Sequence, residues 1–290
     1  MSSKVQVGAL VLCDDAANSV ALLSLLGQVK QQTSLVLLVD HSGQDNSQLA
    51  LAIQTLGVHY LVVASQVGLA AASNHGIQWL MAQHATHVFF LKQDSAPSAS
   101  MLRQLLFAEK HILSTGIALA AVGPAYFDMR NHQMDAVIGR ERCYTRRKYK
   151  PDFAMLIEAG YLSLFGQLIR TSILRELGLL REELVNETVD VEWSLRAAHA
   201  GLRSFVAADA LMQHHGAVIG AMQQTKRTYY RLRNPLLLCR MPHIPWRWKV
   251  TAILKIIPMM VRIMTYSRPR WQHLLSMLRG LRDALLAKPQ

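Results

Sequence analysis

Cysteine is scarce in this sequence of 290 residues, and the three that occur, Cys13, Cys143 and Cys239, lie far apart. An odd number without paired spacing predicts neither a disulfide framework nor a zinc site, and it indicates a reducing compartment such as the cytosol. No signal peptide is expected, because the first short apolar run meets Asp14 and Asp15 without a small-residue cleavage site. We therefore interpret that run as a buried strand.

Two phosphate-binding motifs and a long apolar run are also missing. No GxGxxG follows the first apolar run and no GxxxxGK[ST] occurs, which argues against a dinucleotide-binding Rossmann domain and a P-loop ATPase. The most apolar stretch, residues 248–264, is interrupted by Lys255, Pro258 and Arg262, so it makes a poor transmembrane span.

Acidic residues are nearly absent from the last quarter of the chain. From Lys226 onward there are fourteen basic residues and one acidic residue, Asp283, whereas residues 1–225 hold 17 basic and 18 acidic residues. The net charge of +12 therefore belongs to the tail. A nucleic-acid-binding tail would bind with strong salt dependence, but the many Leu, Ile, Met and Trp residues favour an anionic membrane surface. No nucleic-acid partner is expected.

Short apolar runs alternate with longer helical patterns over the first 125 residues. The strands are predicted at 5–12, 34–39, 59–64, 88–91 and 117–122, and the helices at 18–31, 47–56, 69–83 and 98–113. This alternation predicts an α/β fold with a mostly parallel sheet flanked by helices. Further on, we expect a helix at 167–177 and a short strand just before His214.

Polar side chains follow the predicted strands. Asp14 comes after the first strand, Asp40 after the second, and Asp94 after the fourth, where "VFFLKQDSAP" also contains Lys92. In such sheets, ligands bind at the carboxyl ends of the strands, so these residues are candidates for a binding site. The alternative for Asp94 is that it opens a turn before Pro97.

The segment "NETVDVEWSLRAAHAG" predicts a helix that ends near Gly201, with Thr188 or Asn186 as its cap. Asp190 falls in the first turn, where the helix dipole favours a carboxylate, and Trp193 offers a flat face for a sugar ring. A general base beside a sugar-binding aromatic is one interpretation. Plain stabilisation of the helix end is about equally supported.

Two further segments carry candidate ligands. "LMQHHGAVIG" places His214 and His215 after the predicted short strand, as metal ligands or as ordinary packed or surface residues. "TYYRLRNPLLLCR" places Arg233 beside Tyr230 and Asn234 on one side of a helix, either to bind a diphosphate or as an ordinary amphipathic face.

An ordered set of segments resembles bacterial glycosyltransferases of family 2, and most closely their rhamnosyltransferase-like branch. The resemblance spans about residues 5–240, and its segments are "VDHSG" (39–43), "GLAAASNHGI" (68–77), "LKQDSAPS" (91–98), "VGPAYFD" (122–128), "VDVEWSLRAAHAG" (189–201), "HHG" (214–216) and "YYRLRN" (229–234). It implies a GT-A fold over residues 1–240, with a nucleotide-binding half of about 1–125 and an acceptor half of about 126–240. A basic amphipathic helical tail, 241–290, follows.

The activity implied by this resemblance is inverting transfer of a sugar, best L-rhamnose from dTDP-L-rhamnose, to a lipid-linked saccharide in surface polysaccharide or O-antigen synthesis. The alternatives are another donor, such as a UDP-hexose, and a catalytically degenerate GT-A protein that acts as a membrane-binding or partner-binding scaffold. The implied location is cytoplasmic and peripheral, at the inner face of the cell membrane.

The resemblance also implies roles for single residues. Lys92 stands where the family has the first acid of its DxD motif, and it could itself neutralise diphosphate charge. The general base is Asp190, with Glu192 and Trp193 at the acceptor. A divalent cation, Mn or Mg, would be held by Asp94 with His214 or His215. The nucleotide-sugar contacts are Asp14, Asp40, Asn74, Lys92 and Arg233.

The tail beyond residue 240 predicts two amphipathic helices. In the second helix, one side carries Trp271, Leu274, Leu275, Leu278, Leu281 and Leu285. Basic residues with Trp and Leu are typical of a helix that lies in an anionic membrane surface. The alternative is a helical pair packed on the catalytic domain or on a second copy of the chain in a homo-oligomer.

Overall fold

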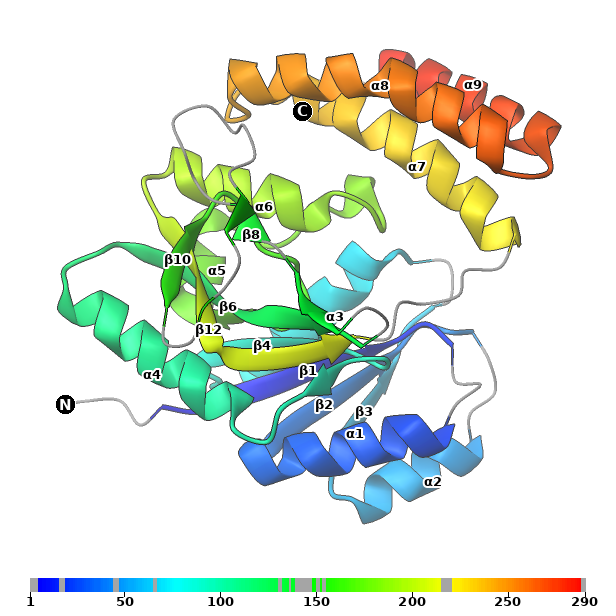
Figure 1. Ribbon diagram of the computed structural model, residues 1–290. Coiled ribbons are helices and arrows are strands. Elements are labelled where there is room, and N and C mark those ends of the chain that lie inside the picture. Colours follow the sequence, from blue (N-terminus) through cyan, green and yellow to red (C-terminus); the bar gives the residue numbers. More distant parts are fainter. Residues whose placement is uncertain are drawn as a thin grey trace.

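A mixed sheet with helices against both faces forms the centre of the molecule (Figure 1). The computed structural model describes residues 5–15, 19–43, 47–64, 67–129, 132–135, 137–138, 148–149, 152, 155–214 and 221–287. The strand order is β10, β12, β6, β11, β4, β1, β2, β3, with β5 paired to β12 and β7 paired to β6.

The first half of the sheet is parallel, as the sequence predicts. Its strands are β1 (Val7–Cys13), β2 (Leu35–Asp40), β3 (His59–Val62) and β4 (His87–Lys92). The connecting helices are α1 (Ser19–Gln32), α2 (Ser47–Thr55) and α3 (Leu69–Ala82). β1 and β2 are buried along their whole length, because helices cover both faces of the sheet.

The second half of the sheet contains antiparallel pairs, so the sheet is mixed, although its longest pairings are parallel as predicted. Its strands are β6 (Leu119–Asp128), β10 (Leu156–Ala159), β11 (Leu168–Arg170) and β12 (Arg203–His214). β11 runs antiparallel to both β4 and β6, and β10 runs antiparallel to β12. Only the pairing of β12 with β6 is parallel among these four strands.

Several predicted elements have different bounds in the structure. The helix expected from residue 167 begins at Thr171, as α5 (Thr171–Leu177), because the residues before it form β11. The helix expected from residue 98 is α4 (Met101–Ser114), because β5 (Ala96–Pro97) pairs with β12. The predicted short strand before His214 is the twelve-residue β12. Shorter pairs are formed by β7 (Gln133–Met134) with β6, and by β8 (Val137–Ile138) with β9 (Lys148–Tyr149).

Successive strand residues point to opposite faces and build two apolar cores. On one face, Val11, Leu38 and Phe89 pack with α1, α2 and α4. On the other face, Leu10 and Phe90 pack with α3, α5 and α6 (Val189–His199). Burial of one such side chain contributes about 1.5–3 kcal/mol, so the sheet is firmly held on both sides.

Three C-terminal helices form an outer layer on the α6 side of the sheet (Figure 1). They are α7 (Ala221–Arg240), α8 (Trp246–Tyr266) and α9 (Arg270–Leu286). The buried face of α9 consists of residues spaced at helical intervals, namely His273, Met277, Gly280 and Ala284. A Cβ atom on Gly280 would lie 2.8 Å from the backbone oxygen of Tyr229 in α7, so the close approach of these two helices requires glycine.

The leucine-rich side predicted for the last helix faces outward. Trp271 is 70% exposed and Leu285 is 72% exposed, while the opposite side of α9 packs on α7. α8 has no fully buried residue. Within the described part of the chain, no helix is long and apolar enough to cross a membrane.

Candidate active site

The ends of β1 and β4 are joined by polar contacts. The Nζ atom of Lys92 lies 3.0 Å from Oδ2 of Asp14. The side-chain oxygen of Gln93 accepts hydrogen bonds from the backbone N–H groups of Asp14 (2.8 Å) and Asp15 (3.1 Å). These contacts fix the loop after β1 against the end of β4, at the sheet edge where the sequence predicts a site.

Asp40 ends β2 beside this pair and is only 2% exposed. Its carboxylate accepts hydrogen bonds from the Tyr60 hydroxyl (2.6 Å) and from the backbone N–H of Ser42 (2.9 Å). Burial lowers the pKa of the adjacent His41, although the nearby carboxylates of Asp14 and Asp40 oppose this shift. The imidazole is therefore neutral at pH 7, and the charges at this edge come from the carboxylates and Lys92.

A cleft of about 770 Å³ opens at these strand ends. Lys92, Asp94, Tyr126, Asp135 and Ser163 are among its lining residues, which come from the ends of β4 and β6 and the loop before β11. This volume is within the range of pockets that hold a ligand of nucleotide size. Lys92, Gln93 and Asp94 at the sheet edge therefore face a space that such a ligand can fill. Asp14 and Asp40 are not among the residues that line it.

Asp94 lies in a tight turn and also lines the cleft. The backbone N–H of Lys92 donates to Oγ of Ser95 (2.9 Å), and the N–H of Ser95 donates to the Lys92 carbonyl (2.8 Å). The two interpretations of Asp94 are therefore compatible, because the turn places an exposed carboxylate in the cleft.

Although the carboxylates of Asp15, Asp94 and Asp135 line the cleft, the described residues do not form a complete metal-binding shell. Among them, no three His, Cys, Asp or Glu side chains gather closely enough to hold a metal. The side chain of His214 and all of His215 lie outside the described residues. Mg²⁺ is often held by one or two carboxylates together with substrate phosphates. Asp94 fits a cation that arrives with a diphosphate.

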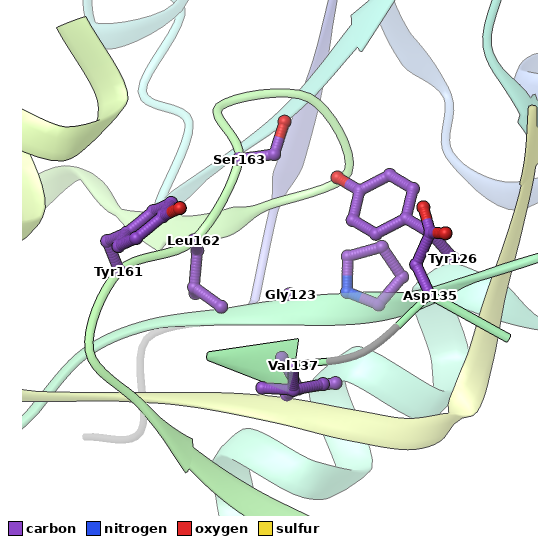
Figure 2. Close-up of a pocket in the computed structure, with 9 residues that line it drawn as sticks. Gly123, Tyr126, Asp135, Val137, Tyr161, Leu162 and Ser163 are labelled. Atoms are coloured by element: carbon purple, nitrogen blue, oxygen red, sulfur yellow. The ribbon is translucent and has the colours of Figure 1, made fainter. Parts of the chain in front are cut away.

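A second cavity of about 290 Å³ adjoins the cleft. Three residues line both the cleft and this cavity, namely Tyr126, Asp135 and Ser163. Tyr161 lines the smaller cavity but not the cleft. Figure 2 shows Tyr126 and Asp135 on one side of this cavity and Tyr161 on the other. None of these residues was predicted as a site residue. Only Tyr126 lies in a segment that carries the family resemblance, "VGPAYFD" (122–128).

Asp190, in the first turn of α6, lies near this second cavity. The backbone N–H of Val191 donates to its Oδ1 atom (2.9 Å), and burial raises its pKa to about 6. Burial raises the pKa of Tyr126, and the negative charge of Asp190 adds to this shift, so the two side chains are within range of an electrostatic interaction. Asp190 itself is not among the residues that line the smaller cavity or the cleft. A carboxylate with this pKa is ionised at pH 7 and can accept a proton from a bound hydroxyl group.

The predicted acceptor contacts of Glu192 and Trp193 are wrong. Trp193 is 2% exposed and packs in the core under α6, so its ring cannot stack on a sugar at the surface. Glu192 is fully buried and lies near the guanidinium groups of Arg196 (3.0 Å) and Arg181 (3.4 Å) and near the Nε2 atom of His243 (2.9 Å). The physical reason is helix geometry, because Glu192 points about 200° around the helix from Asp190.

Asn74 and Arg233 are bonded to the segment between α5 and α6. The Nδ2 atom of Asn74 donates to the Leu180 carbonyl (2.9 Å), and its Oδ1 accepts from the Leu180 N–H (3.0 Å). Arg233 donates to the carbonyl of Glu183 (2.7 Å). Neither is among the residues that line the cleft or the adjoining cavity, so their contact with the nucleotide stays a prediction.

Comparison with known proteins gives relatives in sequence and in fold. No protein-family model matches the chain. It is 24% identical over 236 residues to the dTDP-rhamnosyl transferase RfbF of Shigella flexneri, which covers 77% of this chain and 76% of that protein.

Among solved structures, S. aureus TarS 1–349 in complex with UDP-GlcNAc superposes with a TM-score of 0.60 at 13% identity, over 97% of this chain and 81% of that one. GalNAc-T7 with UDP, GalNAc and Mn²⁺ gives 0.56 at 11% identity, over 92% of this chain and 59% of that one. This chain spans 50% of a longer TarS structure, with a TM-score of 0.58 at 13% identity. Together these likenesses confirm the predicted resemblance to bacterial glycosyltransferases and their α/β fold.

Proposed function

We propose that this chain transfers a sugar from a nucleotide diphosphate to a saccharide hydroxyl group, with inversion at the anomeric carbon. The observation that carries the proposal is the position of Asp190, a carboxylate with a pKa of about 6. Its charge acts on Tyr126, which lines both the smaller cavity and the cleft of Lys92 and Asp94. A base is thus next to a site that suits a diphosphate leaving group.

The donor site in this proposal is the larger cleft. A nucleotide diphosphate leaves readily only if its negative charge is neutralised. Lys92 supplies one positive charge at the cleft, and its ion pair with Asp14 keeps the ammonium group at the strand ends. A divalent cation, Mn or Mg, held by Asp94 would supply further neutralisation when bound.

The favoured donor is dTDP-L-rhamnose. It is supported by the similarity to RfbF, which is named a dTDP-rhamnosyl transferase. A UDP-sugar is the second candidate, since the structural neighbours TarS and GalNAc-T7 were solved with UDP-GlcNAc and with UDP.

The acceptor in this proposal is a lipid-linked saccharide of surface polysaccharide synthesis, with its sugar in the smaller cavity. A direct displacement needs one base, which takes the proton of the acceptor hydroxyl as that oxygen attacks the anomeric carbon. Asp190 is the proposed base, and the effect of its charge on Tyr126 in the cavity wall supports this role. The proposed location is the inner face of the cell membrane, which is supported by the exposed apolar residues of α8.

Calorimetric titration tests this proposal. We expect one of dTDP, UDP and GDP to bind about tenfold more tightly than the others, and more tightly with Mn²⁺ or Mg²⁺ than without. Asp94→Ala should remove the effect of the metal, whereas Glu176→Ala, which removes an exposed carboxylate on α5, should not. If no nucleotide bound to the wild-type chain, the transferase proposal would be rejected in favour of a scaffold.

A further inference from the structure

A third cavity, of about 280 Å³, separates α8 from the body of the protein, and we refer to it as the α8 groove. It is lined by Tyr161, Val191, Arg231, Trp248, Lys255 and Ile256, among other residues. Tyr161 also lines the smaller cavity described above, which is the proposed acceptor cavity. Val191 directly follows Asp190 in the chain. The groove therefore adjoins the proposed acceptor cavity.

One wall of the α8 groove is an apolar stripe of α8. Trp248, Ala252, Ile256 and Met259 recur at helical spacing and face the groove. Val191 of α6 lies among the residues that line it from the body of the protein. Such walls favour a hydrocarbon chain, because contact with it removes apolar surface from water.

The α8 groove also contains two basic side chains, Arg231 and Lys255. Burial and the nearby charge of Arg227 lower the pKa of the Arg231 guanidinium. Arg227 and Arg231 both lie against the carboxylate of Glu187, with the Nε of Arg231 at 4.0 Å from it. Two guanidinium groups thus share this carboxylate, and the surplus positive charge suits a phosphate or diphosphate group.

The opposite side of α8 is apolar and exposed. It carries Trp246, Val250, Ile253, Leu254, Ile257 and Val261, which are between 46% and 71% exposed. A hydrocarbon chain that leaves the α8 groove would therefore pass directly to an apolar surface of the same helix. The groove itself is small, so it can hold only the head and the first part of a long chain.

We infer that the α8 groove binds the diphosphate and the first part of the hydrocarbon chain of a lipid-linked acceptor. Arg231 and Lys255 contact the diphosphate, and the apolar stripe of α8 contacts the chain. The attached sugar then extends past Tyr161 towards Asp190. This inference rests on the proposed function, and it adds where the lipid end of the acceptor lies.

Titration of the full chain with farnesyl diphosphate, in the absence of nucleotide, tests the inference. We expect it to bind at least about tenfold more tightly than inorganic diphosphate, because the apolar stripe contributes to binding. Arg231→Gln and Lys255→Gln should each weaken binding about tenfold, the size of one charged hydrogen bond. Arg279→Gln, which removes an exposed arginine of α9, should leave it unchanged.

Substitution of two consecutive isoleucines of α8 distinguishes binding in the α8 groove from binding at the outer surface of the helix. Ile256 lines the groove and Ile257 is 71% exposed. Ile256→Ala should weaken binding of farnesyl diphosphate, and Ile257→Ala should not. Equal affinity of the wild-type chain for farnesyl and inorganic diphosphate would overturn the inference, as would equal effects of the two alanine variants.

Two further measurements identify the source of any failure. Displacement of farnesyl diphosphate by phosphatidylglycerol vesicles would overturn the inference, because the α8 groove would then bind bulk anionic lipid. A dTDP titration of the same sample tests the proposed function separately. If the chain bound dTDP but not farnesyl diphosphate, only the inference about the α8 groove would be rejected. If it bound farnesyl diphosphate but no nucleotide, the proposed transferase function would be rejected.

Discussion

At the scale of single residues, the chemistry depends on Asp190. Its pKa is raised from 3.8 to about 6 by burial, and the backbone N–H of Val191 limits the shift by donating to its carboxylate. The base form therefore predominates above about pH 6 and is lost as the pH falls through that value. This shift makes the proposed proton transfer depend on pH close to neutrality.

We expect kcat/KM for sugar transfer to fall about tenfold for each pH unit below the pKa of about 6. Asp190→Asn should lower the rate by about 10² to 10⁴-fold and should remove this pH dependence. Release of the nucleotide diphosphate, followed from pH 4.5 to 8, provides the measurement. Glu176→Gln should keep the wild-type profile, because Glu176 is an exposed residue of α5.

The raised pKa of Asp190 affects activity and stability in opposite directions as the pH rises. Between the ordinary pKa of 3.8 and the folded value of about 6, the folded chain holds a proton that the unfolded chain has released. The contribution of Asp190 to the free energy of unfolding thus decreases as the pH rises through this interval. Asp190→Asn should be at least as stable as the wild type at pH 7, and a large loss of stability would contradict this account.

The position of Asp190 in the first turn of α6 was predictable from the sequence, whereas the burial of the residues that follow it was not. A carboxylate in the first turn of a helix is readable from capping patterns, and the segment around it resembled a family motif. The burial of Glu192 and Trp193 was not readable, because it depends on which side of α6 faces the sheet. Tyr126 and Ser163 were missed because tertiary packing, not a local pattern, brings their segments together.

At the scale of elements, the parallel half of the sheet was predictable, since each buried strand alternates with an amphipathic helix. The three-residue strand β11 was not, because its partners β4 and β6 are distant in the chain. The expected cap was also only partly right. Thr188 precedes α6 without a capping bond from its side chain, whereas the side-chain oxygen of Asn186 accepts the N–H of Leu69 at the start of α3 (2.8 Å).

The packing of α9 on α7 depends on Gly280. Alanine there would place its Cβ atom 2.8 Å from the Tyr229 carbonyl oxygen, so the two helices would have to separate. The overpacking costs about 1–3 kcal/mol, and the gain of about 1 kcal/mol in helix propensity offsets part of it. We therefore expect Gly280→Ala to lower the free energy of unfolding by up to about 2 kcal/mol in urea denaturation followed by circular dichroism.

Gly27 provides the matched control for this change. It lies in α1 with open space around the position of a Cβ atom. Gly27→Ala should therefore raise the free energy of unfolding by about 0.5–1 kcal/mol, because only the helix propensity changes. If the two variants were equally stable, close packing between α7 and α9 would not be what holds this layer.

At the scale of the whole molecule, charge and apolar surface lie on the same layer. Thirteen of the fourteen basic residues counted from Lys226 onward lie between the start of α7 and the end of α9, while residues 1–225 are nearly neutral. The predicted boundary at residue 240 divides this layer, because α7 ends there and yet packs with α9. Both interpretations of the tail are partly supported, since α9 packs on the protein by one side and exposes its leucines on the other.

The outer side of α8 should bind anionic membranes. Each exposed apolar side chain that enters the lipid contributes through its buried area, at about 25 cal/mol per Å². Each nearby Lys or Arg adds about 1 kcal/mol on an anionic surface. In a flotation assay, we expect the chain to rise with phosphatidylglycerol vesicles, to bind them less in high salt, and to bind phosphatidylcholine vesicles weakly.

Substitutions on the outer side of α8 separate this surface from the catalytic cleft. Ile253 and Ile257 are 52% and 71% exposed, so Ile253→Glu with Ile257→Glu should abolish flotation and leave dTDP affinity unchanged. A wild-type chain that ignored the vesicles but sedimented as a dimer, and became a monomer in this variant, would instead assign the surface to a second copy. Both outcomes have the same physical cause. The outer side of α8 exposes a large apolar surface, and its burial in a membrane or against a second copy is favourable.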